Sequence, residues 1–145
     1  MKYFWILALF VLLLSCDNDT DNRNPFLQQV NFRFELNLNL PLYNNLNTIG
    51  NPVFVGNAGV GIRGVFVMRN SLDSFIAFEA SCPNQAPSSC TTMELDGQNA
   101  VCPCDDLSYS LFTGQLLNPP SDGSRFFNLL PYRTSVSGNV VTVFN

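Results

Sequence analysis

"CPCDDLSYSLFTGQLLNPP", residues 102–120, is the stretch of this sequence that decides the fold. It begins with two cysteines separated by a proline. Two aspartates follow, where a metal-binding loop would usually carry a histidine. A partner stretch, "SCPNQAPSSC", stands upstream at residues 81–90. The two stretches have the form of the paired loops of a metal-binding site, yet the 145-residue chain contains no histidine.

The chain around these stretches has the pattern of β-strands. Residues 30–38 alternate strictly between apolar and polar side chains, which predicts a strand that covers a core with one face. Residues 62–70 and 74–81 are predicted to form two strands joined by a polar turn. Residues 91–103 and 132–145 are each predicted to contain two strands with a turn between them. In the third of these segments Asp96-Gly97 is a strong tight-turn pair. No ten-residue window has convincing helical periodicity, so the sequence predicts one all-β domain over residues 26–145.

Residues 1–15 have the form of a signal peptide. Lys2 is followed by about a dozen apolar residues, fewer than the ~20 that a transmembrane helix needs. The tripeptide Leu13–Ser15 and Cys16 resemble a lipobox, after which the cysteine is lipidated and becomes the first residue of the mature protein. Such acylation supplies more than one chain, as stable anchoring requires. The alternative is a plain secretory signal with an incidental cysteine.

Residues 16–25 are predicted to be the lipidated cysteine and an acidic, flexible tether, because no apolar residue follows Cys16 before Pro25. The acidic run Asp17, Asp19 and Asp21 resembles the export tags of some surface lipoproteins, and a merely solvated tether remains equally open. We therefore expect a bilayer contact through Cys16 at the bacterial outer membrane, on its periplasmic or cell-surface face.

Composition and motifs exclude several function classes. The net charge is −4 and no lysine follows Lys2, which argues against nucleic-acid partners.

Residues 59–64, "GVGIRG", match a dinucleotide-binding pattern, but a predicted strand follows where that site requires a helix. We interpret them as a Gly-rich loop entering a strand. Without histidine no Ser or Cys triad has its usual base, and the carboxylates lie on predicted turns or polar strand faces. The sequence predicts no enzyme.

Four cysteines remain once Cys16 is assigned to the anchor, namely Cys82, Cys90, Cys102 and Cys104. An even number outside the cytoplasm predicts a disulfide framework, and three pairings are possible from the count alone. A tetrathiolate zinc site is disfavoured because the usual C-x₂₋₄-C knuckles are absent.

A family resemblance covers roughly residues 53–145. The order of "FIAFEASCPN" (75–84), the opening stretch and "LLPYRTSVSGNVVTVFN" (129–145) is similar to a Rieske-type iron–sulfur domain. That family carries C-x-H in a first loop and C-x-x-H in a second, then a turn of the form tG-x-L-x-x-P and a closing hairpin. The resemblance implies an antiparallel sheet sandwich with a small two-loop, formerly cluster-binding subdomain; the strand at 30–38 would be an added edge.

The departure from the family falls on the metal ligands. Asn84 and Asp105 stand where the two histidines would hold the outer iron, and a Rieske cluster needs two thiolates and two imidazoles. The resemblance therefore implies no cofactor and a Cys82–Cys102 disulfide in place of the cluster. Respiratory-type members carry an extra cysteine after each ligand pair, joined in a disulfide. Cys90 and Cys104 take those roles, although the first loop is longer than usual.

The function expected from the resemblance is an accessory or interaction module that binds an unknown envelope protein or glycan. The candidate binding tip consists of four polar residues beside the cysteines, namely Asn84, Gln85, Asp105 and Asp106. The alternative is an electron-transfer protein with an unusually ligated [2Fe–2S] cluster on Cys82, Cys102, Asn84 and Asp105. A redox-active disulfide is a further alternative. It would need an exposed cysteine of low pKa, and no cation flanks "CPC" in the sequence.

Overall fold

The computed structural model describes residues 23–145. The predicted signal peptide (1–15), the lipidation residue Cys16 and the tether up to residue 22 lie outside the described residues. Within residues 23–145, no helix has both the length and the apolar character needed to cross a bilayer.

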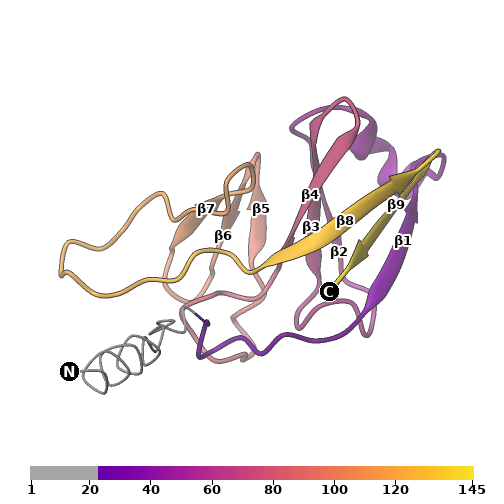
Figure 1. Ribbon diagram of the computed structural model, residues 1–145. Helices are drawn as coiled ribbons and strands as arrows, with labels where there is room; N and C mark the ends of the chain where they lie inside the picture. Colours follow the sequence, from indigo (N-terminus) through magenta and orange to yellow (C-terminus); the bar gives the residue numbers. More distant parts are fainter. Residues whose placement is uncertain (1–22) are drawn as a thin grey trace, which may run out of the picture.

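A six-stranded antiparallel sheet forms the larger part of the fold (Figure 1). Its strands, in spatial order, are β1 (Arg33–Asn37), β9 (Val140–Phe144), β8 (Pro131–Ser137), β4 (Ser74–Glu79), β3 (Val65–Ser71) and β2 (Pro52–Val55). Buried side chains from both edge strands, Leu36 of β1 and Val53 of β2, belong to one hydrophobic core. The sheet must therefore curl around that core. The short 3-10 helix η1 (Pro41–Asn47) adds Tyr43 and Leu46 to it.

A smaller antiparallel sheet stands beside the first and contains β5 (Glu94–Asp96), β6 (Asn99–Val101) and β7 (Ser108–Ser110) (Figure 1). The predicted Asp96-Gly97 turn joins β5 to β6. Gly97 has a φ of +59°, in the left-handed region that favours glycine. The structure thus confirms an all-β fold with a small two-loop subdomain.

The hairpin of β3 and β4 separates two hydrophobic cores. Val65 and Val67 of β3 face the core inside the large sheet, whereas Phe66 and Met68 face a second core. The second core also contains Cys82, Cys102 and the apolar side chains of the small subdomain. Because both faces are covered, the sequence "VFVM" is continuously apolar rather than alternating. The first of the cysteine-bearing segments follows the end of this hairpin at Glu79.

Strand boundaries differ from the predicted ones in a few places. The 30–38 segment is an edge strand as expected, with Leu36 and Leu38 buried and Asn37 exposed. The strand predicted from residue 62 begins at Val65, because residues 62–64 still belong to the Gly-rich loop. The elements η1, β2 and β7 are short and were not predicted.

Candidate functional site

Three loops meet at the end of the small subdomain. The first loop (residues 80–93) leaves β4, the second loop (residues 102–107) joins β6 to β7, and the third loop (residues 117–130) leads to β8. Backbone hydrogen bonds from Cys82 N to Thr91 O (2.8 Å) and from Cys102 N to Leu107 O (2.9 Å) close the first two loops on themselves. The first two loops therefore have an internally hydrogen-bonded backbone.

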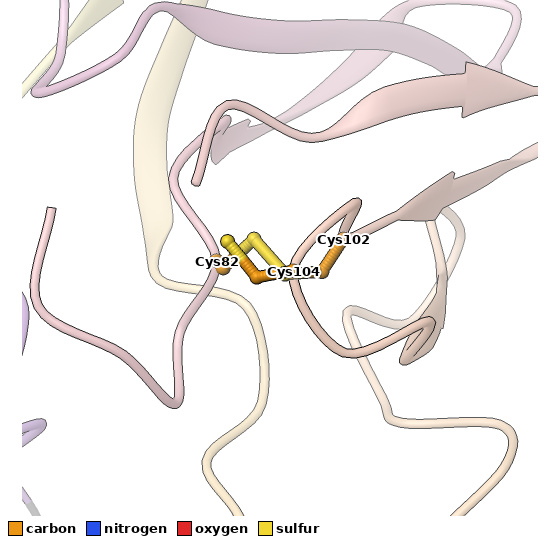
Figure 2. A group of neighbouring side chains, drawn as sticks. All are labelled: Cys82, Cys102 and Cys104. Atoms are coloured by element: carbon orange, nitrogen blue, oxygen red, sulfur yellow. A yellow bond between two sulfur atoms is a disulfide. The ribbon is translucent and has the colours of Figure 1, made fainter. Parts of the chain in front are cut away.

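Two disulfides cross-link the first loop to the second. The inner bridge joins Cys82 to Cys102, with Cα atoms 5.6 Å apart, and the outer bridge joins Cys90 to Cys104, with Cα atoms 5.4 Å apart. These are the two pairings that the resemblance implies. The Sγ atoms of Cys82, Cys102 and Cys104 all lie within 4.8 Å of one another (Figure 2). Cys82 and Cys102 are 1% and 0% exposed, so the inner bridge belongs to the core.

The amide of Asn84 points inward rather than toward solvent. Its Nδ2 donates to the Tyr109 hydroxyl at 2.8 Å and to the Phe127 carbonyl at 3.3 Å, and its Oδ1 accepts from Phe127 N at 2.7 Å. Asn84 therefore ties the first loop to β7 and to the third loop. This removes Asn84 from the predicted binding tip and gives it a structural role instead.

The other three tip residues do gather at the surface. Gln85 Nε2 donates to Asp105 Oδ2 at 2.6 Å, across the first and second loops, and it also faces Cys102 Sγ at 3.9 Å. Asp105 Oδ1 accepts from Leu107 N at 3.1 Å, a local turn contact. Asp106 is exposed and has a φ of +58°, a conformation that aspartate adopts more readily than most residues other than glycine. The Gln85 amide and the Asp105 carboxylate thus meet across the two loops, and the exposed Asp106 carboxylate belongs to the next residue.

Tyr109 is fully buried beneath this surface. Burial raises the pKa of its phenol to about 12, with the negative charge of Asp105 acting in the same direction and the hydrogen bond from Asn84 opposing it. Tyr109 therefore supports the site as a neutral phenol. The sequence offered one sign of this role, the apolar-aromatic stretch that follows "CPCDD".

The N-terminal segment also reaches the site. Asn24 Nδ2 donates to the Pro83 carbonyl at 2.6 Å, and Asn24 Oδ1 accepts from Phe26 N at 2.8 Å. The rings of Phe26 and Phe127 meet edge to face with centroids 6.2 Å apart. Folded contacts therefore include Asn24, two residues before the predicted start of the domain at residue 26.

Sequence reasoning missed a second polar site at the C-terminal end of β4, directly before the first loop. Glu79 is fully buried, and its carboxylate accepts four hydrogen bonds of 2.7–2.9 Å, from Ile62 N, Arg63 N, Ser81 N and the Tyr132 hydroxyl. The expectation that all carboxylates lie on turns or polar strand faces is wrong for this residue. Its position was visible in the alternation Phe75, Ala77, Glu79, which puts it on the core face.

The Gly-rich loop holds the Glu79 carboxylate. Residues 59–64 do form a loop that enters β3, as predicted. The successive N–H groups of Ile62 and Arg63 make a concave anion site of the kind that phosphates use elsewhere, and an internal carboxylate fills it. A Cβ on Gly61 would lie 2.7 Å from Glu79 Oε2, so glycine is needed there.

The donor set at the two loops does not fit a Rieske cluster. Such a cluster takes two thiolates on one iron and two imidazoles on the other. Here the sulfurs of Cys82 and Cys102 are bonded to each other, and the chain has no histidine. The amide of Asn84 is engaged by Tyr109 and Phe127. Neither the two thiolates nor the two imidazoles that a Rieske cluster needs are available in this arrangement.

No protein-family model and no curated protein matches the chain. Among solved structures, the chain is similar to the plasma membrane Rieske protein PetC3 of the cyanobacterium Synechocystis PCC 6803. The identity is 20% over 65% of this chain and 86% of that chain, with a TM-score of 0.48. It is also similar to the ferredoxin of carbazole 1,9a-dioxygenase from Nocardioides aromaticivorans IC177, with 19% identity, coverage of 80% and 98%, and a TM-score of 0.46. The Sphingomonas yanoikuyae B1 ferredoxin matches at 18% identity, with coverage of 68% and 88% and a TM-score of 0.44.

Proposed function

We propose that this chain is a lipid-anchored envelope protein whose Rieske-like domain has lost its iron–sulfur cluster and serves as an accessory or interaction module. The observation that carries the proposal is the inner bridge. Cys82 and Cys102 are joined to each other inside the core, and by the resemblance they correspond to the cysteines that hold iron in Rieske proteins. Two cysteines that bind one iron atom lie close enough to form a disulfide with each other when the metal is lost.

The proposal assigns binding rather than catalysis to the domain. Its buried carboxylate, Glu79, has all four acceptor positions occupied by protein donors, which leaves it no free position for a substrate. The exposed carboxylates of Asp105 and Asp106 have no histidine or lysine beside them in the described chain to serve as a catalytic partner.

The binding surface that we propose consists of Gln85, Asp105 and Asp106, and we call it the acidic tip. The two disulfides fix the loops that carry it, so little conformational entropy would be lost on binding. Its carboxylate and amide groups suit hydrogen bonds from an envelope protein or a glycan. Anchoring through Cys16 would hold this tip at the outer membrane, on the periplasmic or the cell-surface face.

An iron assay and an absorbance spectrum of the purified protein test the cluster-free state. We expect a colourless protein without stoichiometric iron, both as isolated and after reducing reconstitution with iron and sulfide. Restoring the ligands with Asn84→His and Asp105→His should give a cluster with Rieske-like absorbance under the same treatment. The matched control carries Gln85→His and Asp106→His, one residue further along each loop, and should stay colourless.

One result would overturn the cluster-free state, and another would contradict the origin of the loops in a cluster site. A wild-type protein that assembles a cluster would favour the alternative, an electron-transfer protein, because three cysteine sulfurs already lie within 4.8 Å of one another. A double-histidine variant that folds but stays colourless would contradict the idea that the loops keep the frame of a cluster site.

Labelling with a radioactive fatty acid tests the anchor separately. We expect wild-type protein to take up the label and to fractionate with membranes, whereas Cys16→Ser should do neither. The matched control is Cys90→Ser, which removes a different cysteine and should keep the label. A wild type without label would leave a plain secretory signal as the correct interpretation.

A further inference from the structure

The two disulfides differ sharply in their access to solvent. The sulfurs of the inner bridge belong to side chains that are 1% and 0% exposed, so a dissolved thiol cannot reach them in the folded protein. In the outer bridge Cys104 is half-buried and Cys90 is exposed. Cys90 also lines a surface hollow of about 550 Å³ whose wall includes Phe54, Met93 and Pro103. Of the four sulfurs, that of Cys90 is therefore the most accessible to an external thiol.

Cys104 connects the outer bridge to the inner one. Its Sγ lies within 4.8 Å of the sulfurs of both Cys82 and Cys102, whereas Cys90 is not a member of this group. Figure 2 shows the three side chains gathered where the second loop meets the chain that carries Cys82. Disulfides exchange when a thiolate attacks one sulfur of the bond. A thiolate on Cys104 would therefore have its target already in reach.

We propose that the four cysteines form a relay that carries thiol–disulfide exchange from solvent to the buried inner bridge, with a dithiol as the external reductant. The first thiolate of the reductant attacks Cys90 Sγ, and the outer bridge breaks with Cys104 leaving as a thiolate. The second thiol of the reductant then attacks the mixed disulfide and releases Cys90. Two electrons and two protons have entered the protein, and the reductant leaves as an internal disulfide.

The second stage takes place inside the protein. The Cys104 thiolate attacks Cys82 Sγ, so that a Cys82–Cys104 bond forms and the Cys82–Cys102 bond breaks. Cys102 leaves with the electron pair and takes up the proton that Cys104 has lost. This direction is favoured because Gln85 Nε2 faces Cys102 Sγ at 3.9 Å and can donate to the sulfur that leaves. The product also keeps the first and second loops joined.

A matched pair of variants tests the relay. Cys90→Ser and Cys104→Ser both remove the outer bridge, but only the first keeps the sulfur next to the inner bridge. Each folded variant is treated with dithiothreitol under native conditions, quenched with acid and alkylated, and the loss of the inner bridge is followed by mass spectrometry. We expect it to be lost about tenfold or more faster in Cys90→Ser, because the attacking thiolate is held in place. Equal rates would overturn the relay.

The pairing of the cysteines provides a second measurement. In a non-reduced digest of Cys90→Ser, fragment ions should reveal a fraction of Cys82–Cys104 linkage with Cys102 alkylated. Cys104→Ser should contain only Cys82–Cys102. A Cys90→Ser protein with Cys82–Cys102 alone would contradict the relay. Wild-type protein treated with limiting dithiothreitol answers the same question if either variant fails to fold, since its one-bridge species should include Cys82–Cys104.

The relay rests on the cluster-free state of the proposed function, and an iron assay on the same samples separates the two. If the protein is free of iron and the inner bridge is reduced at equal rates in the two variants, the relay is wrong and the proposed function stands. Iron bound to wild-type protein removes both, because Cys82 and Cys102 would then be cluster ligands rather than a disulfide.

Discussion

The hydroxyl of Tyr132 donates a 2.7 Å hydrogen bond to Oε2 of Glu79, across 53 residues of sequence. This bond joins β8 to the end of β4 and completes the four donors around a fully buried carboxylate. A buried carboxylate is costly to desolvate unless it is fully hydrogen-bonded. Burial and the Glu79 carboxylate both raise the pKa of Tyr132 far above its ordinary value, which keeps the phenol a donor.

Tyr132→Phe should lower the free energy of unfolding by about 1.5–3 kcal/mol, the usual range for a hydrogen bond to a charged group. Urea denaturation measures the change. The matched control is Tyr43→Phe, because Tyr43 is also buried in the large-sheet core but its hydroxyl makes no hydrogen bond to a side chain within residues 23–145. We expect a smaller loss there, and similar losses in both variants would contradict the proposed importance of the Glu79 site.

Asn84→Ala should destabilise the domain by about 1–3 kcal/mol, because the buried Tyr109 hydroxyl and the Phe127 backbone both lose a hydrogen-bond partner. Gln85→Ala is the control, since the Gln85 amide bonds to an exposed carboxylate, and its cost should stay within about 0.5 kcal/mol. The variant has a second readout. The bond from Asn84 lowers the pKa of Tyr109, so its removal should raise that pKa further in an ultraviolet titration.

Alkaline pH should weaken the fold through Tyr109. Its pKa is about 12 in the folded protein against 10.0 for an unperturbed tyrosine, so the folded state holds the proton more tightly than the unfolded state does. The resulting stability is complete below pH 10 and is lost as the pH rises toward 12. Tyr109→Phe removes this contribution. Its free energy of unfolding should therefore fall less steeply than that of the wild type over this interval, and identical slopes would contradict the assignment.

Mass spectrometry of a non-reduced digest of wild-type protein should contain Cys82 linked to Cys102 and Cys90 linked to Cys104. A Cys102–Cys104 linkage in untreated protein would place both partners in the second loop and contradict the fold alignment. Loss of the outer bridge in Cys90→Ser should cost about 2–5 kcal/mol of stability, the usual range for a native bridge in a small secreted domain.

The sequence by itself determined the fold class and the chemical identity of the cysteine loops. Strict alternation over residues 30–38 and apolar strands punctuated by turn pairs such as Asp96-Gly97 specify β-structure locally, because each signal depends on neighbours in the chain. The absence of histidine is likewise a property of the sequence alone. The disulfide pairing followed from a family resemblance, since four cysteines by count allow three pairings.

The tertiary structure alone decided which polar groups meet. Alternation places Glu79 on the core face but cannot name its partners, because Ile62, Arg63 and Tyr132 come from other segments of the chain. Asn84 is a half-buried link between the loops because β7 and the third loop bring Tyr109 and Phe127 to it. The approach of Cys104 to the inner bridge arises in the same way. Apart from the neighbouring Cys102 and Cys104, these contacts join residues from different segments of the chain. A pattern of neighbours carries no information on which distant segments pack together.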